Sequence, residues 1–292
     1  TAGEVVCAKK RFLPVKPGQL GLRQSDALFH HTTALPEMLH ELAQEFDLTR
    51  IDAVGVSQKP RPAEGSYMPC FLAGVNAATA FAAARSIPLI YTTHQQGHAA
   101  AALFAARGAD LFTQKVLLFH ISGGTTDLLL CDEVRTITQL GTSTDLYAGQ
   151  AVDRVGVKLG FAFPAGAEVS RLAAACPEEI RPKSSVRGMQ CSLSGLENQC
   201  NALLAAGKSP EYVCKYCLLC VADTVVKMTK AAQKEYPGLP VVCAGGVMSS
   251  DIIRAYVQRT QPDIYFVPGR YSSDNAIGVA VLAAKEVQAW PM

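Results

Sequence analysis

Apolar positions in the first third of the chain indicate both helices and strands. Leu35, Leu39, Leu42 and Phe46 stand at helical spacing, which predicts an amphipathic helix over His31–Phe46. The other elements expected here are strands at Glu4–Ala8, Arg11–Val15, Ile51–Ser57 and Pro88–Tyr91, a loop at Gly18–Asp26, an Ala-rich helix at Phe71–Arg85, and a helix at Gln95–Arg107 capped by Thr93.

The pattern changes near residue 116, where two apolar runs flank a pair of glycines. Val116–Ile121 and Asp127–Cys131 predict a hairpin, and Val134–Leu140 predicts a third strand. An irregular stretch is expected at Phe161–Gly195. The remaining expected elements are helices at Asp145–Leu159, Leu196–Ala206, Pro210–Tyr236, Ser250–Thr260 and Asp274–Gln288, and strands at Pro240–Ala244 and Ile264–Pro268.

Element order predicts a duplicated α/β plan. Three strands followed by helix, strand, helix, strand and helix would occur twice, with the first half lacking its first strand. Ligands of such folds bind near the strand ends, between the two halves.

Composition fits a well-buried globular protein. Apolar residues make up 49% of the chain and charged residues 18%. The net charge is only +2, so the overall charge of the protein gives no reason to predict binding to a nucleic acid or a membrane. The ten cysteines lie in apolar helix and strand patterns, which favours reduced thiols packed in the core over disulfides. No leader and no apolar run near about 18 residues is present, so a cytoplasmic protein that does not enter a membrane is expected.

Two histidines stand four residues apart at an expected helix start. His94 and His98 would project from one face of one turn, and neutral imidazoles at this spacing can share a zinc- or iron-like ion. The alternative is that both are polar side chains that cap the helix or bind a ligand.

Glycine pairs provide two candidate anion sites. In Ser122–Thr126 the glycines leave backbone N–H groups unshielded and the hydroxyls add donors, as a phosphate requires; a plain hairpin turn has the same composition. Gly245 and Gly246 lie between a strand and a helix, where they would admit a nucleotide or only pack the helix closely.

Other polar positions have two interpretations each. Asp274 opens the last helix, either as a cap or as an oxygen ligand to a metal. Asp145, Gln150 and Asp153 are expected on one helix, and the last two would face either a ribose or water. His120 ends a buried strand just before the glycine turn, and the cysteines at 214, 217 and 220 read as core residues of a helix.

Five motifs in order resemble the glycoprotease-like family, the catalytic subunit that makes threonylcarbamoyladenosine in tRNA. His94–His98 resembles His-x-Glu-Gly-His, and Ile121–Thr126 resembles Val-Ser-Gly-Gly-His/Asn-Thr. The other matching segments are Asp145–Arg154, Cys191–Leu196, and Gly245–Val247 with Ser273–Asn275. The resemblance runs from about Gly18 to the C-terminus.

The resemblance implies an actin-like/sugar-kinase fold of two similar α/β domains with a cleft between them. Residues 1–112, completed by the helix at 274–292, would form the first domain, and 113–273 the second, with a helical insertion at about 161–210. It implies transfer of threonylcarbamoyl from threonylcarbamoyl-AMP to N6 of a tRNA adenine next to the anticodon. The implied partners are tRNA, a paralogous actin-like subunit and a small ATPase, and a dimer is possible.

The resemblance also implies the site residues. His94, His98 and Asp274 would hold one divalent ion, Fe²⁺ or Zn²⁺, and His120 replaces a tyrosine that touches the metal in some relatives, as a fourth ligand. ATP, AMP or threonylcarbamoyl-AMP would bind at the following residues: Ser122, Gly123, Gly124, Thr125, Asp153, Gly166, Gly245, Gly246 and Ser250.

This chain departs from the family pattern at several positions. Gln96 replaces the motif glutamate, Thr125 replaces His/Asn and Ser250 replaces an asparagine. The family's opening strand has no counterpart before Thr1. A diverged metal-dependent transferase is expected; the alternatives are a catalytically weak paralogue that serves as a nucleotide-binding partner or scaffold, and a sugar or acetate kinase, which would not need the histidine pair.

Overall fold

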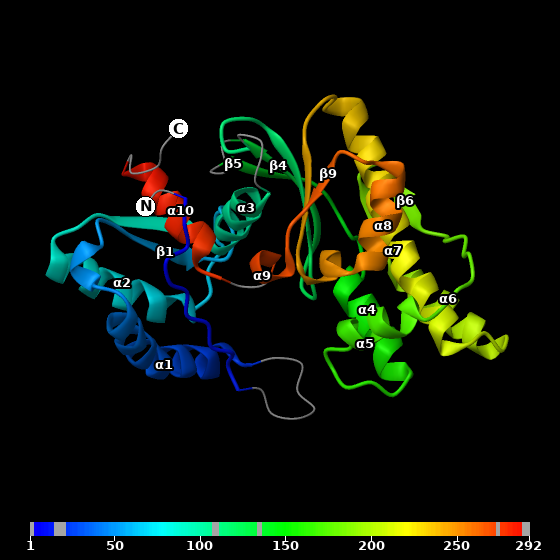
Figure 1. Ribbon diagram of the computed structural model, residues 1–292, viewed down its shortest axis with the longest axis horizontal. Coiled ribbons are helices and arrows are strands. Elements are labelled where there is room, and N and C mark those ends of the chain that lie inside the picture. The colour runs from blue at the N-terminus through cyan, green and yellow to red at the C-terminus, as the bar shows by residue number, and fades with distance from the viewer. Residues whose placement is uncertain (1–2, 15–21, 107–110, 133–135, 273–274, 288–292) are drawn as a thin grey trace. The chain divides into compact units, whose positions relative to one another are not determined.

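The protein is a mixed α/β molecule in two compact units (Figure 1). The computed structural model describes residues 3–14, 22–106, 111–132, 136–272 and 275–287. Thr1–Phe104 and Asp274–Met292 form unit 1, and Ala105–Ser273 forms unit 2. In the described part of the chain, no helix is long and apolar enough to span a membrane.

Unit 1 is built on a pair of parallel strands. β1 (Val54–Lys59) pairs with β2 (Leu89–Thr93). The helices are α1 (Gln24–Glu45), α2 (Phe71–Arg85), α3 (His94–Ala105) and α10 (Ile277–Glu286), and a short 3-10 turn covers Leu48–Arg50. Close helix–strand packing requires a glycine in β1, because a Cβ at Gly55 would lie 2.7 Å from the Val279 carbonyl oxygen of α10.

Unit 2 is built on a five-stranded sheet in the order β5-β4-β3-β8-β9. β3 (Val116–Ile121), β4 (Thr126–Asp132) and β5 (Thr136–Thr142) are antiparallel neighbours, whereas β8 (Val241–Ala244) and β9 (Ile264–Phe266) run parallel to β3. The other elements are α4 (Ala148–Lys158), α5 (Gly166–Ala174), β6 (Ser185–Arg187), β7 (Gln190–Ser192), α6 (Ser194–Ala205), α7 (Pro210–Glu235), a 3-10 turn (Gly246–Ser249), α8 (Asp251–Thr260) and α9 (Gly269–Ser272).

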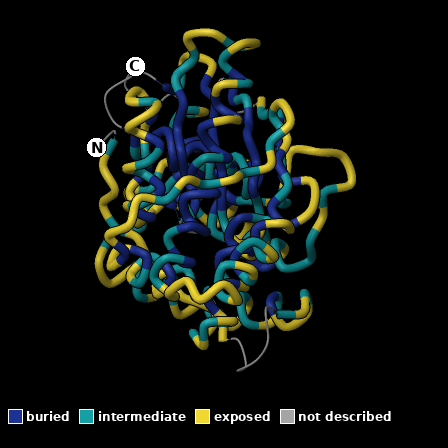
Figure 2. The backbone as a smooth tube through the Cα atoms, turned by 90° about the vertical axis from the view of Figure 1, so that its right-hand side faces the viewer, coloured by how far each residue is buried: buried dark blue, intermediate teal, exposed yellow. Residues whose placement is uncertain are grey.

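The core of unit 2 is one cluster of buried side chains from the central strands and from the helices α4 to α8. Every residue of β3 and β8 is buried, and Figure 2 shows the buried interior of the molecule in dark blue. α7 starts where Ser209 accepts a hydrogen bond from the Tyr212 N–H and Pro210 occupies the first turn, which needs no N–H there. Cys214, Cys217 and Cys220 are buried in this core with free thiols, so their predicted role in core packing is confirmed.

Several sequence-based predictions were wrong. Residues 4–14 are not part of a strand, so the strand predicted at Glu4–Ala8 is absent, as is the described part of the second. The helix predicted from His31 begins at Gln24, and the helix predicted from Asp145 begins at Ala148. The stretch predicted to be irregular, Phe161–Gly195, contains α5 and the β6–β7 hairpin. The opening strands that the duplicated plan predicted for the first half are therefore not found among the described residues of unit 1.

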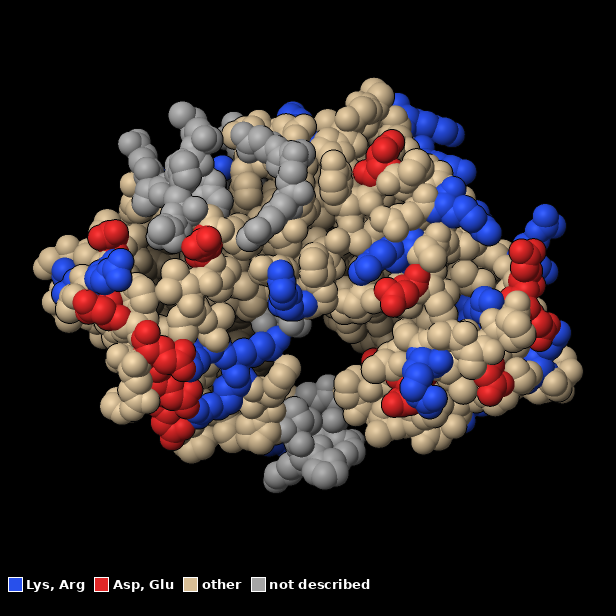
Figure 3. All heavy atoms as spheres, viewed as in Figure 1, with Lys and Arg blue, Asp and Glu red and all other residues tan. Residues whose placement is uncertain are grey.

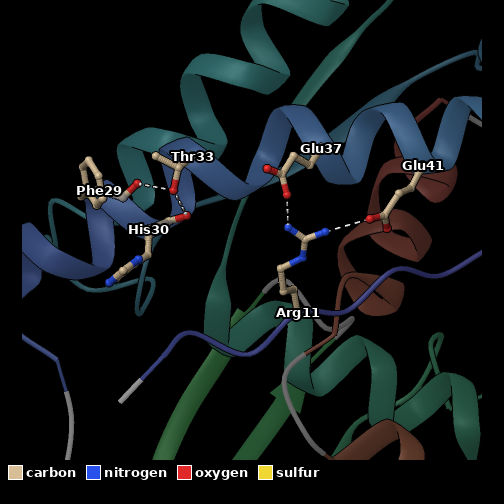
Figure 4. A network of polar contacts seen from close by, with 6 residues as sticks. All are labelled: Arg11, Phe29, His30, Thr33, Glu37 and Glu41. Atoms are coloured by element: carbon tan, nitrogen blue, oxygen red, sulfur yellow. Dashed lines mark hydrogen bonds and ion pairs between the residues drawn. The ribbon is translucent and has the colours of Figure 1, made fainter. Parts of the chain in front are cut away.

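Ion pairs, and not the hydrogen bonds of a sheet, hold residues 4–14 in place. Arg11 extends from this segment toward α1, where it contacts Glu37 and, at 2.8 Å, Glu41 (Figure 4). Lys9 pairs with Glu45 one turn further along the same helix. This segment therefore lies against α1 in an extended conformation without strand partners.

Candidate functional site

The histidine pair lies on the first turns of α3, directly after β2. The Thr93 N–H donates to the Gln96 side-chain oxygen at 2.9 Å, and the Gln96 N–H donates to the Thr93 hydroxyl at 3.2 Å. This reciprocal capping box satisfies two donors at the helix start. It fixes the turn from which His94 and His98 project.

The two imidazoles converge on one point. Their Nε2 atoms lie 3.1 Å apart, and their ring planes cross at 77°. Two nitrogens that each bind one tetrahedral zinc ion at about 2.0–2.1 Å stand about 3.3 Å from each other. The pair therefore fits two ligands of a single ion, and equally a hydrogen bond in which one neutral ring donates to the other.

Glycines bring α10 against this turn of α3. A Cβ at Gly278 would lie 1.8 Å from the Gly97 carbonyl oxygen, and one at Gly97 would lie 3.0 Å from a Val279 methyl. Gly97 stands between the two histidines, so α10 packs directly behind the pair. Asp274, the predicted third ligand, lies outside the described residues, and the described residues contain no group of three or more His, Cys, Asp or Glu that could hold a metal.

The Ser122–Thr125 turn of unit 2 presents open backbone. The Ser122 hydroxyl lies 3.0 Å from the Thr125 hydroxyl and accepts the Gly124 N–H at 3.2 Å. Gly123 and Gly124 are exposed, and a Cβ at either would meet nothing within 4 Å. An anion can therefore approach this main chain directly.

The N-terminus of α4 lies directly beside this turn. The Gly149 N–H donates to the Ser122 carbonyl at 3.2 Å, and a Cβ at Gly149 would lie 2.6 Å from Gly123 Cα. The Ala148 N–H donates to the Thr126 hydroxyl at 2.8 Å. Because a helix N-terminus favours negative charge, the turn and α4 together form a candidate phosphate site.

The Gly245–Gly246 segment reaches the same sheet edge because β3 and β8 are parallel neighbours. Gly245 has a φ of +105°, and a Cβ there would lie 2.1 Å from the Ile121 carbonyl oxygen, so this glycine is required for packing. Gly246 is exposed with open space around it. The Ser250 hydroxyl just beyond is buried and has no hydrogen-bond partner in the described structure.

Asp153 and Gly166 meet at the start of α5. The Asp153 carboxylate accepts the Ala165 N–H at 2.8 Å and the Gly166 N–H. Burial raises the pKa of Asp153 above its ordinary value, although these two donors act in the opposite direction. In the structure the carboxylate caps α5, a role that the sequence pattern did not indicate.

His120 ends β3 beside the glycine turn and is buried. Its Nδ1 lies 3.4 Å from the Thr125 hydroxyl, which donates to the His120 carbonyl at 3.2 Å. His120 belongs to unit 2, whereas His94 and His98 belong to unit 1. The structure thus pairs His94 with His98 and gathers Ser122–Thr125 with Gly149 and Gly245, and the four-ligand site remains a prediction.

Asp145 joins two of the motifs and was not predicted as a site residue. Its carboxylate accepts the Ser192 and Ser194 hydroxyls, each at 2.6 Å, and the Leu193 N–H at 2.8 Å. Burial acts to raise its pKa, but these donors prevail and hold the pKa well below its ordinary value. The sequence carried one signal of this contact, because Asp145–Arg154 and Cys191–Leu196 both resemble motifs of the same family.

Comparison with known proteins gives consistent results. A family model described as tRNA N6-adenosine threonylcarbamoyltransferase matches residues 17–281. The protein of that name from Streptococcus suis (strain 05ZYH33) is 29% identical over 268 residues, which cover 88% of this chain and 78% of that protein. The one from Streptococcus pneumoniae (strain CGSP14) is 28% identical over the same coverage.

Solved structures support the fold. Full-length HypF in its phosphate- and nucleotide-bound form has a TM-score of 0.60 at 15% identity over 89% of this chain, and T. kodakarensis HypF has a TM-score of 0.63 at 13% identity over 88%. This chain covers 42% and 44% of those proteins, so it spans less than half of their length. The predicted two-domain actin-like α/β fold is confirmed.

The family match extends over nearly the whole chain and includes every motif described above. This chain belongs to the tRNA N6-adenosine threonylcarbamoyltransferase family, a family of transferases.

Proposed function

We propose that this protein transfers a threonylcarbamoyl group from threonylcarbamoyl-AMP to N6 of a tRNA adenine next to the anticodon. The observation that carries the proposal is the open backbone of Gly123 and Gly124 against the N-terminus of α4, in a chain of this family. This arrangement suits the phosphate of an adenylate.

The adenylate would bind along one edge of the unit 2 sheet. Ser122, Gly123, Gly124 and Thr125 would hold the phosphate through N–H and hydroxyl donors. The space beside Gly246 is open to a ligand, while the close packing of Gly245 on Ile121 keeps the Gly245–Gly246 segment next to β3. The unpartnered Ser250 hydroxyl would gain a ligand partner there, and Asp153 with Gly166 would lie near the ribose.

We propose that His94 and His98 hold one divalent ion, Fe²⁺ or Zn²⁺, with Asp274 and His120 as further ligands. The 3.1 Å separation of the two Nε2 atoms supports the first two ligands. An ion bound there supplies Lewis acidity toward the acyl oxygen. Gln96 is engaged as the cap partner of Thr93 and is not a base.

The reaction needs an attacking amine and a held leaving group. The adenine N6 forms a bond to the carbamoyl carbon, the bond from that carbon to the AMP phosphate oxygen breaks, and the amine loses a proton. AMP leaves with the bonding electron pair. The turn at Ser122–Thr125 would hold the phosphate in place while its charge develops, which lowers the barrier by positioning and electrostatics.

The proposed partners are tRNA, a paralogous actin-like subunit and a small ATPase. Lys and Arg side chains are spread over the face that Figure 3 shows, among acidic ones. Arg11 is paired with Glu37 and Glu41, and Lys59 donates to the Ala63 carbonyl. Both side chains are therefore already engaged within the chain.

The test is transfer to unmodified tRNA. Purified protein is mixed with threonylcarbamoyl-AMP, tRNA and the partner subunits, and digested nucleosides are analysed by mass spectrometry. Formation of threonylcarbamoyladenosine, dependent on this chain, is expected. Adenylate binding without any transfer would overturn the proposal in favour of a scaffold subunit.

A further inference from the structure

We propose that a cavity in unit 2 binds a small amphiphilic anion, a monocarboxylate with an apolar body. The cavity lies between α7, α8 and the segment 178–182, and its volume is about 690 Å³. Small-molecule sites commonly occupy about 300–1,000 Å³. No proposed metal- or adenylate-binding residue lines this cavity, so the inference does not depend on the transferase proposal.

The walls of the cavity are largely apolar. Ile180 and Pro182 form one side, and Leu219 of α7 with Ile252 of α8 forms the other. α7 and α8 run side by side in Figure 1. An apolar ligand body would displace water from these side chains, which is favourable in proportion to the area covered.

Hydrogen bonds hold the segment over the two helices. The Lys215 ammonium donates to the Cys176 and Glu178 carbonyls, each at 2.8 Å. Beyond the segment, the Ser184 hydroxyl donates to Asp223 at 2.5 Å, and Asp223 also accepts from the Tyr256 hydroxyl at 3.3 Å. The cavity is therefore formed before a ligand arrives, which reduces the entropy cost of binding.

The charges around the cavity favour an anion. Arg181 and Arg259 line it, and neither makes an ion pair within the described residues. The Arg259 guanidinium lies over the Tyr256 ring, 5.6 Å from its centroid, which presents it at the cavity wall. Two acidic residues line the cavity beside three basic ones. Glu178 pairs with Lys208, and Glu179 adds one negative charge against those of Arg181, Lys215 and Arg259, so the lining keeps a positive balance.

A carboxylate on an apolar chain satisfies both features. A guanidinium binds a carboxylate through two parallel hydrogen bonds, and the apolar walls accept the chain. An uncharged chain would lack the first interaction, and acetate would lack the second.

The test uses octanoate as the probe and isothermal titration as the readout. Octanoate is expected to bind, while 1-octanol and acetate bind at least about tenfold more weakly. The double variant Arg181→Ala/Arg259→Ala is expected to lose at least about tenfold in octanoate affinity. Arg187→Ala, a matched control at the exposed end of β6 and away from the cavity, is expected to bind like the wild type.

A second variant tests the volume instead of the charge. Ala255 is exposed on α8 and lines the cavity, so Ala255→Trp fills the space without altering the buried core. Loss of octanoate binding with an unchanged melting temperature supports the proposal. Absence of octanoate binding to the wild type, or equal binding to the wild type, the arginine double variant and Ala255→Trp, overturns it.

Discussion

Thr93 and Gln96 exchange two hydrogen bonds around the first turn of α3, at 2.9 and 3.2 Å. A glutamate at position 96 would make the same contact with its carboxylate oxygen. Glutamine at this position of the metal motif therefore preserves the local geometry, although it removes a negative charge beside the histidines. The substitution changes the electrostatics of the turn and leaves its shape intact.

The first prediction concerns this cap. Gln96→Ala is expected to lower the free energy of unfolding by about 1 kcal/mol, because the Thr93 N–H loses its acceptor. Gln96→Glu is expected to stay within about 0.5 kcal/mol of the wild type. Urea titrations measure both, with Gln95→Ala next to it as the control, and equal stability of Gln96→Ala and the wild type would contradict the assigned contact.

The second prediction concerns the packing of α10 on α3. Gly278→Ala is expected to destabilise unit 1 by about 1–3 kcal/mol or more, because its Cβ would collide with the Gly97 carbonyl oxygen. Thermal unfolding measures the loss. Gly195→Ala, where the Cβ meets open space, serves as the control; a Gly278→Ala protein as stable as this control would show that the helices do not approach so closely.

The third prediction concerns the glycine turn. The double variant Gly123→Ala/Gly124→Ala is expected to fold normally, since both Cβ atoms enter open space, and to bind AMP about tenfold more weakly. The methyl groups would stand between the phosphate and the backbone N–H groups. Calorimetric titration with AMP measures the loss, and unchanged AMP affinity would place the nucleotide elsewhere.

The fourth prediction concerns Asp145. Its folded pKa is lowered, so its contribution to stability is complete above the unfolded value of about 4 and is lost as pH falls through the folded value. Asp145→Ala is expected to be less stable than the wild type at neutral pH by about 1 kcal/mol or more. The difference should shrink as the pH falls below about 4.

Unfolding curves of wild type and Asp145→Ala at several pH values test this. Asp251→Ala is the control, because the Asp251 side chain is 93% exposed and its ion pair with Arg254 spans 3.6 Å. A difference between wild type and Asp145→Ala that does not depend on pH would mean that the carboxylate charge is not what Ser192 and Ser194 stabilise.

Local sequence signals predicted much of the fold. The helix Phe71–Arg85 and the strand Val116–Ile121 begin and end where the pattern placed them, because apolar periodicity and the flanking breakers act within each segment. The N-terminal strands were wrong because a strand needs a partner. Residues 4–14 contain two short apolar runs, but Lys9 and Arg11 bind α1 instead. The helix predicted from Asp145 begins only at Ala148. The Asp145 carboxylate accepts hydrogen bonds from Ser192 and Ser194, which are far away in the chain, and this contact holds Asp145 outside the helix.

The candidate site was predictable in its parts and not in its arrangement. The spacing of His94 and His98 predicted that they share a face, and the 3.1 Å contact agrees with that geometry. That Gly245 packs on Ile121 follows from the parallel pairing of β3 and β8, which no local pattern encodes. The cap that Asp153 forms on α5 likewise depends on a helix that the sequence pattern did not reveal.

If His94 and His98 hold one divalent ion, the purified protein carries that ion, and elemental analysis measures it. About one iron or zinc per chain is expected in the wild type and in His40→Ala, a control on the exposed face of α1. The folded double variant His94→Ala/His98→Ala is expected to lose the metal. A wild type without stoichiometric iron or zinc, or a double variant that retains it, would contradict the claim.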